Sequence, residues 1–278
     1  MTPSERLGRR RYLAAAGAAA IPFAAGCTAL DSDGGSDGGY DRVVLDAPDE
    51  YERLRDARDR GELEQPIHGD ELPDVAAPCT IRDEEIATGE FEGERHSLYT
   101  FIFSRCHGAC PALTSSLRHV QDDSVEGDYV DDVALVNVTF DPEYDTADVL
   151  EEYDRTYGVD HGLGNWYSLR PETETDARTY VEEEFGCFFV RNEDFEEHGD
   201  EHDDDHDGDE DAHDGDGDEP AEPDELDGED NGMEMAFQHE SMIVFANADG
   251  YVERTYVGDD LPSYDELIDD VRTVLESW

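Results

Sequence analysis

The chain has 278 residues, enough for one domain with extensions, and it is strongly acidic. Asp and Glu total 76 against 19 basic residues, all of them arginine, so the formal net charge is −57. With no basic face to neutralise phosphates, this composition argues against a nucleic-acid partner and against charge-driven docking on an anionic membrane. Five cysteines are also too few for a disulfide scaffold.

The negative charge is densest in one tract, but the rest of the chain is acidic too. Residues 193–232 contain 23 acidic residues in 40, together with four histidines and almost nothing apolar. At molar salt the Debye length is only about 3 Å, which screens most of the resulting self-repulsion. The composition, with its missing lysine, therefore favours a protein from a salt-loaded environment over one with a merely acidic, solvated surface.

Residues 1–26 have the pattern of an export signal. Three arginines at residues 9–11 precede an Ala-rich apolar run of about 15 residues, which is short for a membrane-spanning helix. R-R-R-Y-L resembles the twin-arginine signal, and A-A-G-C resembles a lipoprotein processing box with Cys27 as the lipidated residue. We expect a lipid anchor on the outer face of the cell membrane; the alternative is a plain signal anchor with an incidental cysteine.

After the signal, residues 27–71 are expected to form a tether and an N-terminal extension. Residues 31–39 (D-S-D-G-G-S-D-G-G) have the composition of a flexible linker, and residues 51–60 predict a short charged helix ended by Gly61. From about residue 72 the pattern changes to alternating strands and helices.

The rest of the chain predicts an α/β domain with a mixed sheet flanked by helices. Strands are expected at residues 97–104, 133–140, 166–169 and 187–191, and helices at residues 111–121, 146–157 and 172–185. A hairpin over residues 241–246 and 251–257, turning at N-A-D-G, and an amphipathic helix over residues 263–278 complete the pattern.

The acidic tract at residues 193–232 interrupts this alternation. It has no means of burying apolar area, so it is expected to be a long disordered insertion between two strands. Its H-G-D-E-H-D-D-D-H spacing brings imidazoles and carboxylates together. Loose binding of divalent cations and simple solvation at high salt both remain open for it.

The most specific chemical feature is F-I-F-S-R-C-H-G-A-C-P, which places Cys106 and Cys110 between a strand and a helix. A helix N-terminus favours thiolate over thiol, so the pair is suited to redox chemistry or to holding one soft metal ion. The spacing alone does not choose between the two. Cys79 and Cys187 lie in predicted strands and are expected to be buried, either as free thiols or as a structural pair.

Three motifs in order resemble the Sco/SenC copper chaperones of respiratory oxidase assembly. They are C-x-x-x-C-P at residues 106–111, V-N-V-T-F-D-P-E-Y-D-T at residues 136–146, and Q-H-E-S-M-I-V-F-A-N-A-D-G at residues 238–250. The resemblance implies a thioredoxin-like fold over residues 72–278.

The resemblance also implies a metal site. The family's ligands would fall on Cys106, Cys110 and His239, holding one copper ion, as Cu(I) or Cu(II), per chain. Independently, Cu(I) prefers soft thiolates, and an imidazole completes a three-coordinate site. The chain departs from the family at His107, where a proline is usual, and a solvated loop histidine is the expected role there.

Three functions follow as expectations. The first is a metallochaperone that hands copper to the binuclear copper centre of a respiratory oxidase, with the copper-accepting subunit as partner. The second is a membrane-tethered thiol–disulfide oxidoreductase that uses Cys106 and Cys110 to keep that centre's cysteines reduced. The third, a peroxiredoxin-like peroxidase, has only Arg105 beside Cys106 in its favour. Asp141 and Asp145 are expected to cap the helix at residues 146–157 and to shape the site surface.

Overall fold

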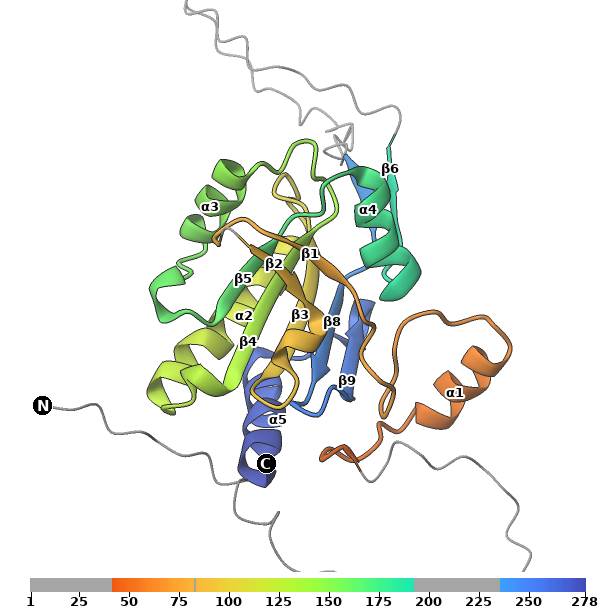
Figure 1. Cartoon of the computed structure of the whole chain (residues 1–278). Helices are drawn as coiled ribbons and strands as arrows, with labels where there is room; N and C mark the ends of the chain where they lie inside the picture. Colours follow the sequence, from red (N-terminus) through yellow and green to blue (C-terminus); the bar gives the residue numbers. More distant parts are fainter. Residues whose placement is uncertain (1–41, 83, 193–235) are drawn as a thin grey trace, which may run out of the picture. The chain divides into compact units, whose positions relative to one another are not determined.

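The structure is a computed structural model that describes residues 42–82, 84–192 and 236–278 (Figure 1). The predicted signal peptide, Cys27, the glycine-rich tether and the acidic insertion at residues 193–232 lie outside the described residues. Within the described ranges, no helix combines the length and apolar character needed to cross a bilayer.

The centre of the fold is a seven-stranded mixed sheet with the strand order β2-β1-β5-β4-β3-β8-β9. Strands β3, β4 and β5 are parallel to one another, whereas β1, β2, β8 and β9 join by antiparallel pairing. The bounds are β1 (Ala76–Cys79), β2 (Glu84–Ala87), β3 (His96–Ile102), β4 (Val133–Thr139), β5 (Trp166–Leu169), β8 (Met242–Ala246) and β9 (Val252–Val257). The predicted mixed sheet and the β8–β9 hairpin are confirmed.

Strands β3 and β4 form the middle of the sheet because both are continuous apolar runs that can be buried on two faces. Every residue of each strand is buried, as expected for parallel strands covered by helices on both sides. Their register pairs Leu98 with Leu135 and Phe101 with Val138. The carboxyl ends of these two strands lead into the loops that carry most of the candidate site.

Helices α2 (Cys110–Glu126) and α5 (Tyr264–Ser277) pack together on one face of the sheet (Figure 1). In α2 the buried residues Leu113, Leu117 and Val120 recur at helical spacing, so they form one apolar stripe. Pro111 lies in the first turn, where its missing N–H costs no hydrogen bond. A capping box formed by Ser263 and Glu266 begins α5.

Helix α3 (Ala147–Thr156) lies beside α2, because the Tyr153 hydroxyl forms a 2.9 Å hydrogen bond with that of Thr114. Helix α4 (Glu174–Arg178) continues as one π-helical stretch over Thr179–Glu184, so the predicted helix at residues 172–185 is helical but not uniformly α. The rings of Tyr99 and Phe185, 5.3 Å apart, join the end of this stretch to the sheet.

The segment before the sheet packs against β9. Helix α1 (Tyr51–Asp59) buries no residue. On either side of it, however, Val44 and Leu45 donate their backbone N–H groups to the Glu253 carboxylate at 2.9 Å, and Gly69 donates to the carbonyl of Val252 at 2.8 Å. These contacts tie residues 42–71 to the sheet.

A separate two-stranded ribbon consists of β6 (Phe189–Arg191) and β7 (Phe237–His239), paired antiparallel. Strand β6 lies within the predicted strand at residues 187–191. Strand β7 is not among the predicted strands, because a strand of three residues is too short to give a recognisable pattern. This ribbon brings His239 to the carboxyl end of the central strands.

Candidate metal centre

Cys106 lies in the loop between β3 and α2, and Cys110 is the first residue of α2. The loop turns tightly, since the backbone N–H of Cys106 donates to the carbonyl of Phe103 at 3.1 Å. Both cysteines are buried and both are free thiols. The predicted position of the pair, between a strand end and a helix start, is therefore confirmed.

His239 reaches the two cysteines although it lies 133 residues after Cys106 in the chain. Its Nε2 atom is 3.6 Å from the Cys106 Sγ and 3.5 Å from the Cys110 Sγ. Among the described residues these three form one group whose potential ligand atoms all lie within 4.8 Å of one another. The structure thus brings together the three residues that the sequence singled out.

The orientation of the His239 ring suits a ligand role. Its Nδ1 lies 2.9 Å from the backbone carbonyl of Glu240, and a carbonyl can only accept, so Nδ1 carries the proton in the neutral ring. The unprotonated Nε2 then faces the two sulfur atoms. The ring lies against Phe103 and Phe140, with centroid distances of 5.6 and 5.2 Å, which restricts its rotation.

The two thiols differ in acidity. A hydrogen bond from Cys110 lowers the pKa of Cys106 to about 4; burial opposes this shift, and His239 adds to it. Burial, together with the Cys106 thiolate, raises the pKa of Cys110 well above its usual value. Burial disfavours a charged His239 ring, but the hydrogen bonds of the charged ring to Cys106 and to the Glu240 carbonyl, together with the charge of Cys106, outweigh this, so the pKa of His239 is raised. Cys106 is therefore the thiolate of the pair at neutral pH.

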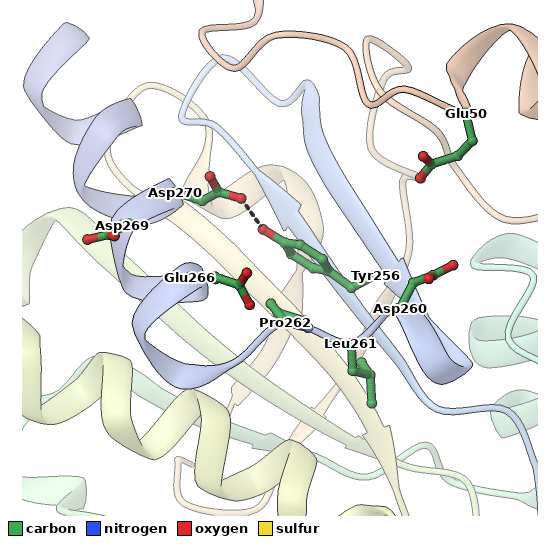
Figure 2. A pocket seen from close by; sticks show the side chains of 8 residues that line it. All are labelled: Glu50, Tyr256, Asp260, Leu261, Pro262, Glu266, Asp269 and Asp270. Carbon is green, nitrogen blue, oxygen red and sulfur yellow. Dashed lines mark hydrogen bonds between the residues drawn. The ribbon is translucent and has the colours of Figure 1, made fainter.

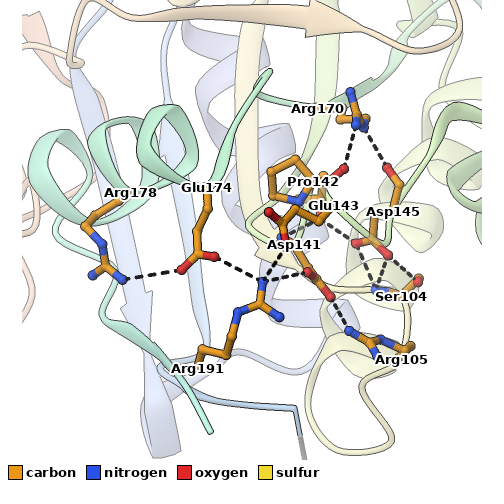
Figure 3. Close-up of polar contacts among 11 residues, drawn as sticks. Ser104, Arg105, Asp141, Pro142, Glu143, Asp145, Arg170, Glu174, Arg178 and Arg191 are labelled. Atoms are coloured by element: carbon orange, nitrogen blue, oxygen red, sulfur yellow. Dashed lines mark hydrogen bonds and ion pairs between the residues drawn. The ribbon is translucent and has the colours of Figure 1, made fainter. Parts of the chain in front are cut away.

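Asp141 and Asp145 do not cap the following helix, so that expectation is wrong. The N-cap of α3 is Thr146, whose hydroxyl accepts from the backbone N–H of Val149. Asp145 instead accepts hydrogen bonds from the side chains of Ser104 and Thr139 (the Ser104 bond is drawn in Figure 3). Both carboxylates are fully buried. A buried carboxylate needs hydrogen-bond partners, and these two find them in other side chains instead of the backbone N–H groups of the helix. Burial raises the pKa of Asp145 to about 6 despite these bonds.

The Asp141 carboxylate accepts from two arginines that belong to different segments. Its Oδ2 is 2.7 Å from Arg105 Nη2, and its Oδ1 is 3.1 Å from Arg191 Nη2 (Figure 3). Arg191 also bonds Glu174 at 3.2 Å. Sequence analysis did not single out Arg191, because nothing in the local pattern relates residue 191 to residue 141.

The remaining candidates are His107, the cysteines Cys79 and Cys187, and the histidines of the insertion. His107 is exposed, as expected, and lies outside the three-residue group. Cys79 and Cys187 are buried free thiols, so of the two alternatives the free form is confirmed. The Cys187 Sγ donates to the same Glu240 carbonyl that orients His239, at 3.5 Å. The insertion's histidines lie outside the described residues.

A hollow elsewhere on the molecule has a different character. Figure 2 shows it at the start of α5, beside Tyr256 of β9. Its polar lining is carboxylates and one tyrosine hydroxyl, which donates to Asp270 at 2.5 Å; the lining residues are Glu50, Tyr256, Asp260, Leu261, Pro262, Glu266, Asp269 and Asp270. It offers no sulfur or imidazole, so it lacks the ligands that a soft metal prefers.

The comparisons with known proteins agree with the resemblance read from the motifs. No curated protein matches the chain significantly. Residues 79–201 match the sequence model of the SCO1/SenC family.

Solved structures match the fold at low sequence identity. A SCO1/SenC family lipoprotein from Bacillus anthracis is 17% identical with a TM-score of 0.52, covering 77% of this chain and 99% of that chain. BsSco, described as a member of the Sco family of cytochrome c oxidase assembly proteins, is 18% identical with a TM-score of 0.51, covering 76% and 96%. Copper-bound yeast Sco1 is 14% identical with a TM-score of 0.50, covering 75% and 91%. The expected thioredoxin-like fold is thereby confirmed, and the predicted resemblance to the SCO1/SenC family is confirmed over residues 79–201.

Proposed function

We propose that the chain is a metallochaperone that binds one copper ion, as Cu(I) or Cu(II), and delivers it to the binuclear copper centre of a respiratory terminal oxidase. The observation that carries the proposal is the convergence of two sulfur atoms and one imidazole nitrogen within 4.8 Å. The match to the SCO1/SenC family model supports it, since BsSco is described as belonging to a family of cytochrome c oxidase assembly proteins and yeast Sco1 has been solved with copper bound.

The donor set fits copper chemically. Thiolates and imidazole are ligands that Cu(I) prefers, and the Cys106 thiolate is already deprotonated at neutral pH, so it can bind without first losing a proton. The loop between the cysteines is exposed at His107 and Gly108. An acceptor's ligands can approach from that side, which transfer to a copper-accepting subunit requires.

The second candidate function is a thiol–disulfide oxidoreductase, and the unequal acidity of the two cysteines favours it. The Cys106 thiolate would attack a partner disulfide, form a mixed disulfide and release one partner thiolate. Cys110, after losing its proton, would attack the Cys106 sulfur and release the second partner thiolate. Two electrons pass to the partner, and the chain is left with a Cys106–Cys110 disulfide.

The proposal includes an anchor. The R-R-R-Y-L and A-A-G-C motifs support export and lipidation at Cys27, which would hold the domain at the outer face of the cell membrane beside a membrane-bound oxidase. Cell fractionation tests this: the chain is expected in the membrane fraction, and Cys27→Ser is expected in the soluble one. Membrane retention of Cys27→Ser would count against the lipid anchor.

A copper titration of the fully reduced chain at molar salt tests the ligand set. Wild type is expected to bind one Cu(I) tightly. His239→Ala is expected to weaken that binding by more than about 100-fold, because even loss of an outer partner of a ligand costs 10–100-fold. His107→Ala is the matched control, since His107 lies between the two cysteines but outside the group. Thiol–disulfide exchange is expected to survive both changes.

Two results would count against the proposal. The first is a wild-type copper affinity in His239→Ala, which would show that the proposed ligand set is wrong. The second concerns a chain that lacks residues 198–231, which is expected to keep its one tightly bound copper. If copper disappeared with that segment, the acidic tract would be the only binder, and the dithiol would be better explained as a redox catalyst.

A further inference from the structure

The strand that carries His239 needs support from outside its own ribbon. Strands β6 and β7 have three residues each and, within the part of the chain that the structure describes, pair only with one another. A two-stranded ribbon is marginally stable by itself. The cysteines, in contrast, are carried by β3 and α2, which are built into the main sheet and its helical cover. The distance from His239 to the sulfur atoms therefore depends on what holds the ribbon against the Cys106 loop.

Three side chains connect these two parts, and we name Arg105, Asp141 and Arg191 the arginine bridge (Figure 3). Arg105 directly precedes Cys106. Arg191 ends β6 and pairs in register with Phe237, two residues before His239. Asp141 binds one arginine with each carboxylate oxygen, at 2.7 and 3.1 Å. One carboxylate thus joins the cysteine loop to the histidine ribbon.

The bridge is held in place by its surroundings. The Asp141 side chain is 1% exposed, whereas Arg105 and Arg191 are 18% and 33% exposed. The Arg105 guanidinium lies 3.9 Å from the centroid of the Tyr144 ring, and that of Arg191 lies 4.5 Å from the Phe237 ring. Both cations are therefore confined between an aromatic ring and a carboxylate.

Burial also makes the bridge effective in concentrated salt. A Debye length of about 3 Å at molar salt screens exposed ion pairs, but a carboxylate removed from water is screened much less. Removing Arg191 leaves the buried Asp141 carboxylate with Arg105 as its remaining arginine partner, which is unfavourable for a charge removed from water. Arg191 meets other acidic groups too, Glu174 at 3.2 Å and Glu143 at 3.9 Å, but neither belongs to the cysteine loop.

From these contacts we infer that the arginine bridge positions His239 over Cys106 and Cys110, and that Arg191 is a positioning residue for the metal centre. The copper part of this inference rests on the proposed function, whereas the position of the ribbon does not.

The test compares Arg191→Met with Arg178→Met in the full chain. Methionine keeps apolar contact with the ring and removes the charge. Arg178 is the matched control, because it also lies over a ring, Phe189 at 5.0 Å, and pairs with Glu174 and Glu182, but no contact joins it to Asp141. Arg191→Met is expected to weaken Cu(I) binding about 10- to 100-fold, in the range measured for outer partners of metal ligands. Arg178→Met is expected to leave it unchanged.

A second readout needs no copper. Hydrogen exchange of the peptide covering residues 236–240 is expected to be faster in metal-free Arg191→Met than in wild type or Arg178→Met, while exchange of β4 stays unchanged. A general loss of stability would accelerate hydrogen exchange in both segments. Arg191→Lys, which keeps one charge but not the planar fork, is expected to recover part of both the affinity and the protection.

The outcomes separate the two claims. If wild type bound no copper, the proposed function would fail, and hydrogen exchange would still decide whether the bridge holds the ribbon. If wild type bound copper but Arg191→Met matched Arg178→Met in copper affinity and in hydrogen exchange, the inference that the arginine bridge positions His239 would be overturned. Should Arg191→Met not fold, Arg191→Lys with wild-type affinity and exchange would overturn it as well.

Discussion

The thiols of Cys106 and Cys110 lie against the same imidazole, but the fold gives them different roles. Cys110 is fully buried at the start of α2, and burial raises the pKa of its thiol. A hydrogen bond from Cys110 lowers the pKa of Cys106 to about 4, and the neighbouring His239 adds to this shift. One sulfur is thus ready to attack or to bind, and the other follows once its proton has left. That division is compatible with both proposed functions, copper binding and disulfide exchange.

His96 is a buried histidine outside the site, and it predicts a pH effect on stability. Its Nδ1 accepts the backbone N–H of Ala248 at 3.1 Å, and burial lowers its pKa to about 4. In the unfolded chain a histidine titrates near 6.5, so between pH 6.5 and 4 only the unfolded state takes up this proton. Its contribution is complete above about pH 6.5 and is lost as the pH falls, by roughly 3 kcal/mol in all.

The variant His96→Gln isolates this contribution, because its amide oxygen can accept the same N–H but does not titrate. Denaturant unfolding of both proteins at about pH 7 and pH 4.5 is expected to show a smaller loss of stability in the variant. Asp145, whose raised pKa acts in the opposite direction, is common to both proteins and cancels from the difference. An equal loss of stability between the two pH values in both proteins would show that His96 is not the responsible group.

At the scale of elements, the passage from α4 to the ribbon depends on one glycine. After the π-helical stretch over Thr179–Glu184, Gly186 adopts a φ of +65°. A Cβ atom there would lie 2.3 Å from the backbone nitrogen of Gln65. The turn into Cys187 and β6 therefore needs both the left-handed conformation and the close approach that glycine allows.

Gly186→Ala is expected to destabilise the chain by more than about 2 kcal/mol, since backbone strain and a backbone clash add together. Gly164→Ala is the matched control, because its φ is +74° but nothing lies within 4 Å of its Cβ position. This variant is expected to lose only the backbone strain energy, about 1–2 kcal/mol. Thermal or denaturant unfolding measures both. Equal losses in the two variants would mean that the segment at Gln65 moves aside without cost.

At the scale of the whole molecule, charge is the dominant property. A formal net charge of −57 over 278 residues creates strong self-repulsion, which opposes the compact state. The arginines near the metal centre are engaged locally, as in the arginine bridge, and do not offset this excess at long range. Counter-ions are expected to supply the screening that the chain itself lacks.

The unfolding midpoint is therefore expected to rise, by roughly 10 °C, between about 0.1 M and 3 M potassium chloride, because the Debye length falls from about 10 Å to 3 Å or less. Sucrose is the control, as it stabilises by exclusion from the surface without screening charge. An unfolding midpoint indifferent to salt would contradict the halophilic interpretation. The measurement uses the full chain, so that its whole charge is present.

Much of the fold is readable from local pattern. The continuous apolar runs predict β3 and β4, and Trp166–Leu169 is a strand over the predicted residues. Proline in the first turn marks the start of α2, and the serine before residue 264 marks that of α5. These elements follow from the sequence because periodicity and capping act within a few residues. The pair Cys106 and Cys110 is identifiable for the same reason.

Other features arise only when distant segments meet. The capping expectation failed because Asp141 and Asp145 find buried partners in other segments, and Thr146 is left to cap α3. The sequence by itself determined the dithiol, the main elements of the sheet and helices, and the acidic character. The tertiary structure decided the approach of His239 to the cysteines and the joining of Arg191 to Asp141, because both depend on side chains meeting across large sequence separations, which local periodicity does not encode.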